Sequence, residues 1–163
     1  MKCLPLAAAA RVTNPPNFQV RRPDTHQFRT LDGLSRMAGV PPDRLRRLIA
    51  KEATDNALDS CDRTGCPGQA TIERDGDRYT VTDQGNGIDS DPATLADLFS
   101  TARPMLSGKY WRAPTRGVLG NGLRVLVAAV ALCGGTITVE ARGLRTVLRP
   151  QRIGPTEIVE QAS

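Results

Sequence analysis

The chain has 163 residues, of which 39% are hydrophobic and 24% are charged, and this composition is typical of one globular domain rather than a disordered or fibrous protein. It has a single histidine and four cysteines without Cys-x-x-Cys spacing, which argues against a histidine metal site, a Ser-His-Asp triad and a disulfide scaffold. The net charge of +5 permits a polyanionic partner such as DNA without implying one, because 17 acidic residues are mixed with the 22 basic ones.

The first 27 residues are expected to form a flexible extension, because Pro5, Pro15, Pro16 and Pro23 interrupt them. The apolar run that follows Met1 is too short for more than a faint likeness to a secretory signal. No stretch approaches the roughly 20 apolar residues of a membrane span. We therefore expect a cytoplasmic protein without a membrane partner, with one domain over residues 28–163.

A long helix is predicted over residues 43–60, where Leu45, Leu48 and Ile49 have the i, i+3, i+4 spacing of an apolar face. Glu52, Ala53, Asn56 and Ala57 continue this face, although a buried carboxylate without a partner is costly. Two interpretations stay open. The face is either a solvated acidic surface that overlaps the apolar one, or a surface on which a metal ion, a water molecule or a nucleotide binds.

Two strands are predicted at residues 70–73 and 78–82, joined at a turn over residues 75–76. Asp83 ends the second strand, and Gly85 and Gly87 let a flat ligand approach the backbone that follows. A carboxylate in this place can accept a hydrogen bond from the exocyclic amine of a base. It can equally close the strand as an ordinary Asx turn.

A short helix at 92–99 and a long loop at 100–116 precede a glycine-rich run at 117–122, which leads into an apolar helix at 123–132. The backbone N–H groups of the run and the positive end of the helix dipole favour an anion there. The run matches neither a Walker A loop nor a dinucleotide-binding turn. Five basic residues and no acidic residue lie between Asp97 and Glu140, and they suit a polyphosphate or, alternatively, nucleic acid: Arg103, Lys109, Arg112, Arg116 and Arg124.

Further strands are predicted at 136–141, 145–148 and 157–159, the first two as a hairpin around Arg142-Gly143. The order of helices and strands predicts an α+β fold with a mixed or antiparallel sheet and helices on one face.

Three motifs occur in the order and at the rough intervals of the N-box, G1 and G2 motifs of the GHKL, or Bergerat-fold, ATPases: Glu52-x-x-Asp55-Asn56-x-x-Asp59, Asp83-x-Gly85-x-Gly87 and Gly117-x-x-Gly120-x-Gly122. The chain resembles this family over roughly residues 34–159. The family includes gyrase B subunits, MutL proteins, ninety-kilodalton heat-shock chaperones and histidine kinases. The resemblance implies a two-layer α/β sandwich of Bergerat type with a mixed sheet. Residues 107–109 and the short interval between G1 and G2 look most like the topoisomerase VI B subunit.

The resemblance implies that ATP and Mg²⁺ bind here. Glu52 would be the catalytic general base, Asn56 would bind the metal and Asp83 would bind the adenine amino group. Thr156 would support adenine through water, and Lys109, in a lid over residues 100–116, would lie near the phosphates. The implied ATP-binding residues are Asp55, Asn56, Asp83, Gly85, Gly87, Ile88, Lys109, Gly117, Val118, Leu119, Gly120, Asn121, Gly122, Leu123 and Thr156.

Glu52 favours hydrolysis, because histidine kinases generally lack this glutamate. The resemblance also implies ATP-gated dimerisation, as a homodimer or with a partner subunit, with DNA involved only indirectly. In gyrase, MutL and topoisomerase VI a second domain supplies a lysine to the γ-phosphate. Since this chain ends just after the third motif, we expect a fragment of a longer protein or ATP binding with weak hydrolysis. Three alternatives stay open: an ATP-dependent interaction module with little turnover, a histidine-kinase-like ATP-binding domain, and a DNA-binding domain that is not an enzyme.

Overall fold

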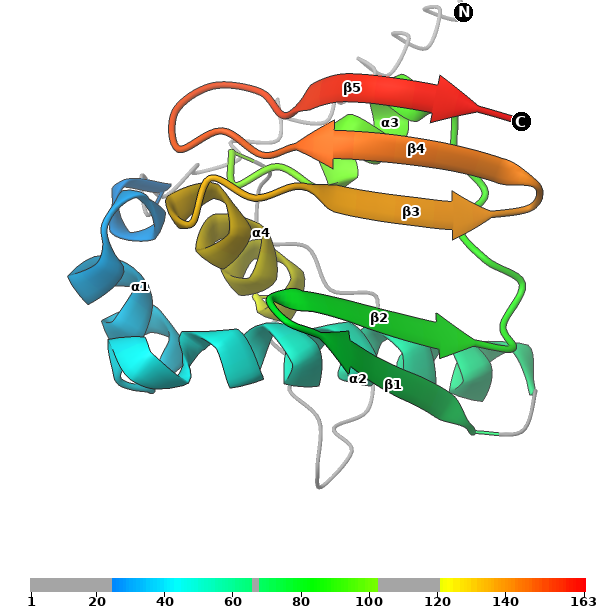
Figure 1. Ribbon diagram of the computed structural model, residues 1–163, viewed down its shortest axis with the longest axis horizontal. Coiled ribbons are helices and arrows are strands. Elements are labelled where there is room, and N and C mark those ends of the chain that lie inside the picture. The colour runs from blue at the N-terminus through cyan, green and yellow to red at the C-terminus, as the bar shows by residue number, and fades with distance from the viewer. Residues whose placement is uncertain (1–24, 66–67, 103–120) are drawn as a thin grey trace, which may run out of the picture.

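The computed structural model describes residues 25–65, 68–102 and 121–163. Its helices and strands are η1 (Thr25–Arg29), α1 (Leu31–Ala38), η2 (Pro42–Arg44), α2 (Leu45–Thr64), β1 (Ala70–Asp75), β2 (Arg78–Asp83), α3 (Pro92–Leu98), α4 (Gly122–Leu132), β3 (Ile137–Ala141), β4 (Leu144–Arg149) and β5 (Glu157–Ala162) (Figure 1). Most of the predicted extension at 1–27 and most of the predicted loop at 100–116 lie outside the described residues. Within the described ranges, no helix has both the length and the apolar character needed to span a membrane.

The ends of the helices follow from a few capping residues. Thr30 caps α1, because its side-chain oxygen accepts the N–H of Gly33 at 3.1 Å. Gly65 ends α2 in the left-handed conformation, with φ of 68°, and donates its N–H to the carbonyl of Cys61. The helix predicted to end at residue 60 therefore runs to Thr64, because the first glycine after it lies at position 65.

The core has two parts, and α4 lies between them, which confirms the prediction of a buried apolar helix. One side of α4, with Val125 and Ala128, packs against η1, α1 and the start of α2. The other side, with Leu126 and Val127, packs against α3 and Leu148 of β4. Figure 1 shows α4 between β3 and α2, to the right of α1. Burial on both sides explains why nearly every residue of α4 is apolar.

The strands form two antiparallel sheets. One is the hairpin β1–β2, in which Ala70 pairs with Asp83, and the other has the order β3-β4-β5. The hairpin predicted around Arg142-Gly143 is confirmed, since Ala141 pairs with Leu144. The α+β class is confirmed as well. The strands are divided between two sheets where the sequence predicts one, because β2 packs on α2 and is not paired with β3 (Figure 1).

Candidate active site

The inward face of α2 is a line of residues four apart, and the polar residues of the first motif border it. Its members are buried or half-buried: Leu45, Ile49, Ala53, Ala57 and Cys61. Glu52 is half-buried beside this line and Asn56 is exposed. The continuation of the apolar face is therefore confirmed for the two alanines, while Asn56 faces outward.

The carboxylate of Glu52 lies against the backbone of Gly122, the first residue of α4. A Cβ atom added at position 122 would come within 2.0 Å of Glu52 Oε2, closer than real Cβ contacts allow. Only glycine leaves room for the carboxylate in this position, because any side chain at 122 would make the end of Glu52 move. The packing of α2 along α4 thus places Glu52 at the end of the glycine-rich run, although 70 residues separate the two positions in the chain.

Lys51 joins the two acidic groups of the first motif. Its Nζ lies 2.7 Å from Asp55 Oδ2 and 3.3 Å from Glu52 Oε1. The hydrogen bond to Asp55 raises the pKa of Lys51, and the opposing effect of burial is smaller. The carboxylate side chains are only 17% and 19% exposed, so the ammonium lowers the cost of holding two like charges together. Lys51 is not among the predicted site residues, although its i, i+4 spacing from Asp55 is typical of an ion pair on a helix.

Asn56 is arranged so that one oxygen remains for a ligand. Its Nδ2 donates to the carbonyl of Glu52 at 2.7 Å, which leaves Oδ1 as the acceptor atom. Among the described residues, no group of three or more His, Cys, Asp or Glu could hold a metal ion. Mg²⁺ commonly binds through one or two protein oxygens together with substrate phosphates and water. Asn56 therefore fits a magnesium site that a bound nucleotide completes.

The turn after β2 is built around Asp83. Its Oδ1 accepts the N–H of Gly85 at 2.7 Å, so the Asx-turn interpretation describes the geometry, and Oδ2 is the oxygen left for a ligand. A Cβ added at Gly85 would lie 2.6 Å from Ser60 Oγ. A Cβ added at Gly87, whose φ is 70°, would lie 3.1 Å from the Cβ of Ala141. Glycine at both positions lets the turn fit between α2 and β3.

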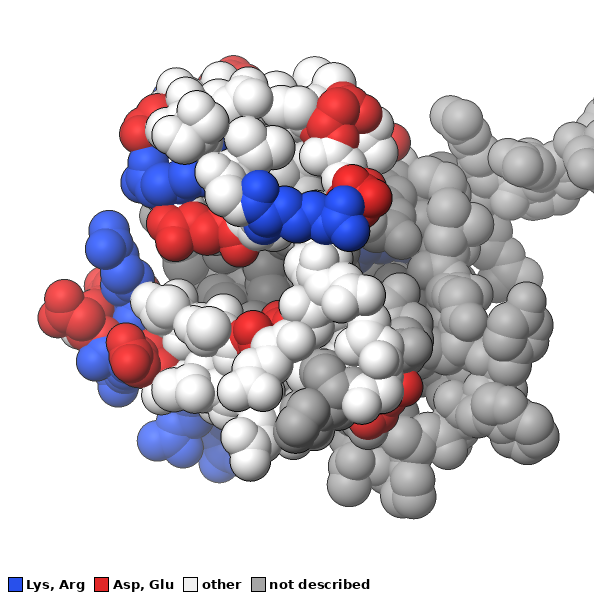
Figure 2. All heavy atoms as spheres, turned by 90° about the vertical axis from the view of Figure 1, so that its right-hand side faces the viewer, with Lys and Arg blue, Asp and Glu red and all other residues white. Residues whose placement is uncertain are grey.

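Residues 83–89, which we call the G1 loop, lie at the end of the molecule that faces the viewer in Figure 2. Basic and acidic side chains lie next to each other there, with no large patch of one sign. The ion pairs explain this pattern, since Arg142 pairs with Asp89 and Arg145 pairs with Glu140 and Glu160. Four of the five basic residues on which the DNA-binding alternative depends lie outside the described residues, so this face does not test it: Arg103, Lys109, Arg112 and Arg116.

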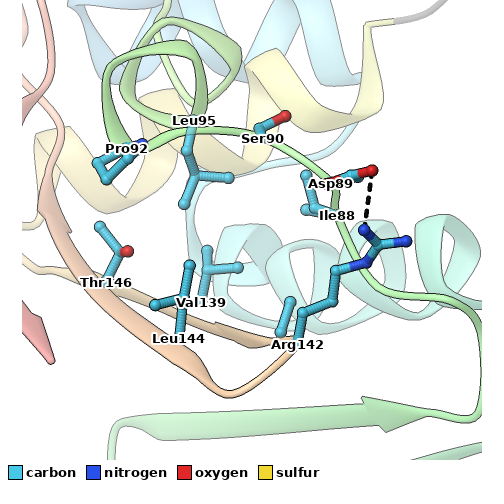
Figure 3. A pocket seen from close by; sticks show the side chains of 10 residues that line it. Ile88, Asp89, Ser90, Pro92, Leu95, Val139, Arg142, Leu144 and Thr146 are labelled. Atoms are coloured by element: carbon cyan, nitrogen blue, oxygen red, sulfur yellow. Dashed lines mark ion pairs between the residues drawn. The ribbon is translucent and has the colours of Figure 1, made fainter. Parts of the chain in front are cut away.

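A small cavity lies beside the G1 loop, between α3 and the β3–β4 hairpin (Figure 3). Ile88, Leu95, Val139 and Leu144 point into it, and the Arg142–Asp89 ion pair closes one side. Its volume of about 50 Å³ holds a few water molecules rather than a purine base. Of the predicted site residues only Ile88 lines it, so this cavity is not the predicted nucleotide site.

The structure does not bring Thr156 to Asp83. Thr156 is buried, and its Oγ1 donates to the carbonyl of Phe99 at 2.7 Å, just after α3. The start of β5 and the end of β2 lie far apart in Figure 1. The contribution of Thr156 to adenine binding stays a prediction, and its described role is to attach β5 to α3.

Arg124 is buried in the core. Only 2% of the residue is exposed, and its guanidinium lies 4.4 Å from the centre of the Phe28 ring. The same group reaches the carbonyl of Thr101 and Oδ1 of Asn121, each at 3.4 Å. The prediction that Arg124 helps to hold a polyphosphate is wrong, because the guanidinium points into the core.

Of the predicted glycine-rich run, the described part is its C-terminal end. Asn121 and Gly122 are half-buried, as is Leu123, and the side chain of Asn121 does not cap α4. The N–H groups in the first turn of α4 therefore donate no hydrogen bond to the side chain of Asn121. The remaining predicted residues lie outside the described part of the chain: Lys109, Gly117, Val118, Leu119 and Gly120.

An α+β domain in which a helix carboxylate lies against the first turn of a buried helix, where backbone N–H groups favour phosphate, together with a carboxylate–glycine turn after a strand, suits a nucleotide-binding protein. Residues 41–153 match the family described as Histidine kinase-, DNA gyrase B-, and HSP90-like ATPase. Because the match covers more than half of the chain, the chain belongs to this family and carries an ATP-binding domain of GHKL type. No curated protein and no solved structure matches the chain.

Proposed function

We propose that this chain is a Mg²⁺-dependent ATPase in which Glu52 is the general base. The observation that carries the proposal is the contact between the Glu52 carboxylate and Gly122 at the start of α4. The first turn of a helix favours phosphate, so a nucleotide bound there has its terminal phosphate next to this carboxylate. Phosphoryl transfer to water needs mainly positioning and charge neutralisation, which suits a carboxylate held by two packed helices.

Each residue has a defined part in this proposal. Glu52 orients a water molecule toward the γ-phosphate and accepts its proton, while Asn56 Oδ1 holds the metal ion. Mg²⁺ held there would neutralise charge on the phosphate oxygens. Asp83 Oδ2 accepts the adenine amino group, because Oδ1 is already bonded to Gly85.

The test is single-turnover ATP hydrolysis by the Glu52→Gln variant. Glutamine has the shape of glutamate and keeps the contact with Gly122, but it cannot accept the proton. We expect hydrolysis to slow by about 10² to 10⁴-fold, with ATP affinity largely retained. Glu73→Gln, a matched change on the exposed strand β1, is expected to leave the rate unchanged. A Glu52→Gln variant that hydrolyses ATP at the wild-type rate would remove Glu52 from the mechanism.

A second candidate is an ATP-dependent interaction module with little hydrolysis. The ion pair between Lys51 and Glu52 favours it, because the ammonium competes for the carboxylate that must accept a proton. If this pairing limits the base, Lys51→Met should raise the single-turnover rate. A rate that falls instead favours the ATPase. Transfer of the γ-phosphate from ATP to a protein histidine, detected with labelled ATP, would favour the histidine-kinase-like alternative.

The proposal extends to ATP-gated dimerisation in a cytoplasmic system related to type IIB topoisomerases. Its support is the spacing of the three motifs and the resemblance of residues 107–109 to the topoisomerase VI B subunit. Light scattering coupled to size-exclusion chromatography, with Mg²⁺ and a non-hydrolysable ATP analogue, tests the dimer directly. We expect the mass to double with the analogue and to stay at one chain without nucleotide.

A further inference from the structure

The turn between β3 and β4 has an unusual residue at its first position. Ala141 pairs with Leu144, so the turn consists of Arg142 and Gly143, with φ of 53° and 77°. Two-residue turns with positive φ at both positions favour Asn-Gly or Gly-Gly, because a larger side chain is strained there. Arg142 is the one residue other than glycine with positive φ in the described part of the chain. Backbone strain of this kind often accompanies a functional contact.

The strained conformation directs the Arg142 side chain onto the G1 loop. Its Nε donates to the carbonyl of Asn86 at 3.2 Å, and its guanidinium lies 2.8 Å from Asp89 Oδ2 (Figure 3). Next to Arg142, Ala141 lies so close to position 87 that a side chain there would require Ala141 to shift slightly. The hairpin therefore holds the G1 loop at three places, residues 86, 87 and 89.

The G1 loop has a second support on its other side, where Gly85 lies against Ser60 of α2. The loop is thus held between α2 and the β3–β4 hairpin. No strand pairing joins the two sheets in the described residues, so the contacts of Arg142 are part of what fixes the loop relative to the larger sheet. Asp83 starts this loop and binds the N–H of Gly85.

We propose that Arg142 is a positioning residue that holds the G1 loop in the form that presents Asp83 to the base of the nucleotide, an inference that rests on the proposed ATP binding. It lies outside all three motifs and acts through the loop, without touching the nucleotide. The hydrogen bond to Asn86 carries most of the effect. The ion pair to Asp89 contributes little, because the two side chains are 50% and 79% exposed.

The experiment uses Arg142→Asn, because asparagine adopts positive φ readily and keeps the turn while removing the contacts. Hydrogen exchange of the nucleotide-free chain should show faster exchange at residues 85–89 in this variant, with an unchanged or higher thermal midpoint. Calorimetry with Mg²⁺ should show ATP affinity reduced by about threefold to tenfold. Affinity for inorganic tripolyphosphate should stay at the wild-type value, because the loop serves the base and not the phosphates.

Two controls separate this role from a general effect on the hairpin. Arg145→Ala removes a nearby arginine, in β4, that pairs with Glu140 and Glu160 and not with the loop, and it should leave ATP affinity unchanged. Asp89→Asn should reduce ATP affinity less than Arg142→Asn does.

Several outcomes would overturn the inference. Wild-type loop exchange in Arg142→Asn would show that the contact does not order the loop. Equal losses of ATP and tripolyphosphate affinity would show a structural role only. Wild-type ATP affinity in the variant would remove Arg142 from nucleotide binding and leave the proposed function intact, whereas a wild-type chain that binds no ATP at millimolar concentration would overturn the proposed function itself.

Discussion

The two ends of the candidate site, the proposed phosphate end at Glu52 and Gly122 and the proposed base end at Asp83, are held in different ways. At the phosphate end, Glu52 and Gly122 belong to α2 and α4, which pack against each other within the core. At the base end, Asp83 begins a loop that is supported by Ser60 and by the exposed side chain of Arg142. Packed helices fix a position more firmly than a few surface contacts do. Substitutions at the phosphate end should therefore change stability and hydrolysis together, and those at the base end should mainly change affinity.

The largest effect is expected for Gly122→Ala. The new methyl group would overlap Glu52 Oε2, at 2.0 Å, and must displace the carboxylate or shift α4. We expect single-turnover hydrolysis to fall by about 100-fold or more, the range set by loss of a general base. The thermal midpoint should fall as well, because the displaced groups are packed between two helices.

Two further variants identify the cause of this loss. Combining Gly122→Ala with Glu52→Ala removes the overlap, so the thermal midpoint should recover while hydrolysis stays low. Gly68→Ala places a methyl group where nothing lies within 4 Å, and it should change neither quantity. If Gly122→Ala alone keeps the wild-type rate, the phosphate end is less rigid than we infer.

The second effect concerns Arg124, which connects the phosphate end to the N-terminal part of the core. Arg124→Ala removes the contact with the Phe28 ring and the bonds to Thr101 and Asn121. We expect the free energy of unfolding, measured in urea, to fall by about 2 kcal/mol. Arg46→Ala, which breaks an exposed ion pair with Asp77, should cost about 0.5 kcal/mol or less. Equal losses in the two variants would argue against a stabilising role for the buried guanidinium.

The third effect tests the base end. Gly87→Ala and Gly76→Ala both place a side chain at positive φ, 70° and 56°, and both should lower the free energy of unfolding by about 1 kcal/mol. Only the methyl group at 87 meets Ala141, at 3.1 Å, while nothing lies within 4 Å at 76. We expect about tenfold weaker ATP binding for Gly87→Ala and wild-type binding for Gly76→Ala, measured by calorimetry. Matching affinities in the two variants would show that the G1 loop adapts without cost.

Much of the fold could be predicted from local sequence patterns. The buried helix α4 follows from its apolar residues on all sides, and the β3–β4 hairpin follows from Arg142-Gly143 between two strands. The end of α2 was predicted four residues early, although Gly65 signals it. The division into two sheets was not predicted, because the pairing of β2 depends on tertiary contacts rather than on its own residues.

The site could be predicted only in part. The motif spacing brought Glu52 and the glycine-rich run into one hypothesis, and the structure places Glu52 against Gly122. The burial of Arg124 could not be read from its charge, since only the position of Phe28 shows that the guanidinium has an aromatic partner. The hydrogen bond from Arg142 to Asn86 likewise could not be predicted, because it depends on where the G1 loop lies, 56 residues earlier in the chain.

The smallest effect is expected at α3, the helix that follows the base end. Asp91 caps this helix, since its Oδ1 accepts the N–H groups of Ala93 and Thr94 at 3.0 Å. The side-chain hydrogen bond from Thr94 is the main cause that lowers the pKa of Asp91 below its ordinary value of 3.8. A carboxyl group whose pKa is lower in the folded state stabilises the fold above its unfolded pKa, and this contribution is lost as the pH falls through the folded pKa.

Asp91→Asn keeps a good capping residue but removes the charge, so the loss at neutral pH should be small. The wild-type thermal midpoint should therefore approach that of the variant as the pH falls below about 4 and then through the lowered pKa at which folded Asp91 becomes protonated. Asp97→Asn, near the other end of α3, removes a carboxylate without removing a capping bond and is the matched control. ATP affinity at neutral pH should be unchanged in Asp91→Asn, because the supports of the G1 loop, Ser60 and Arg142, lie outside α3. A marked loss of affinity would mean that the base end depends on α3 as well, and that it is less independent of the core than its few contacts indicate.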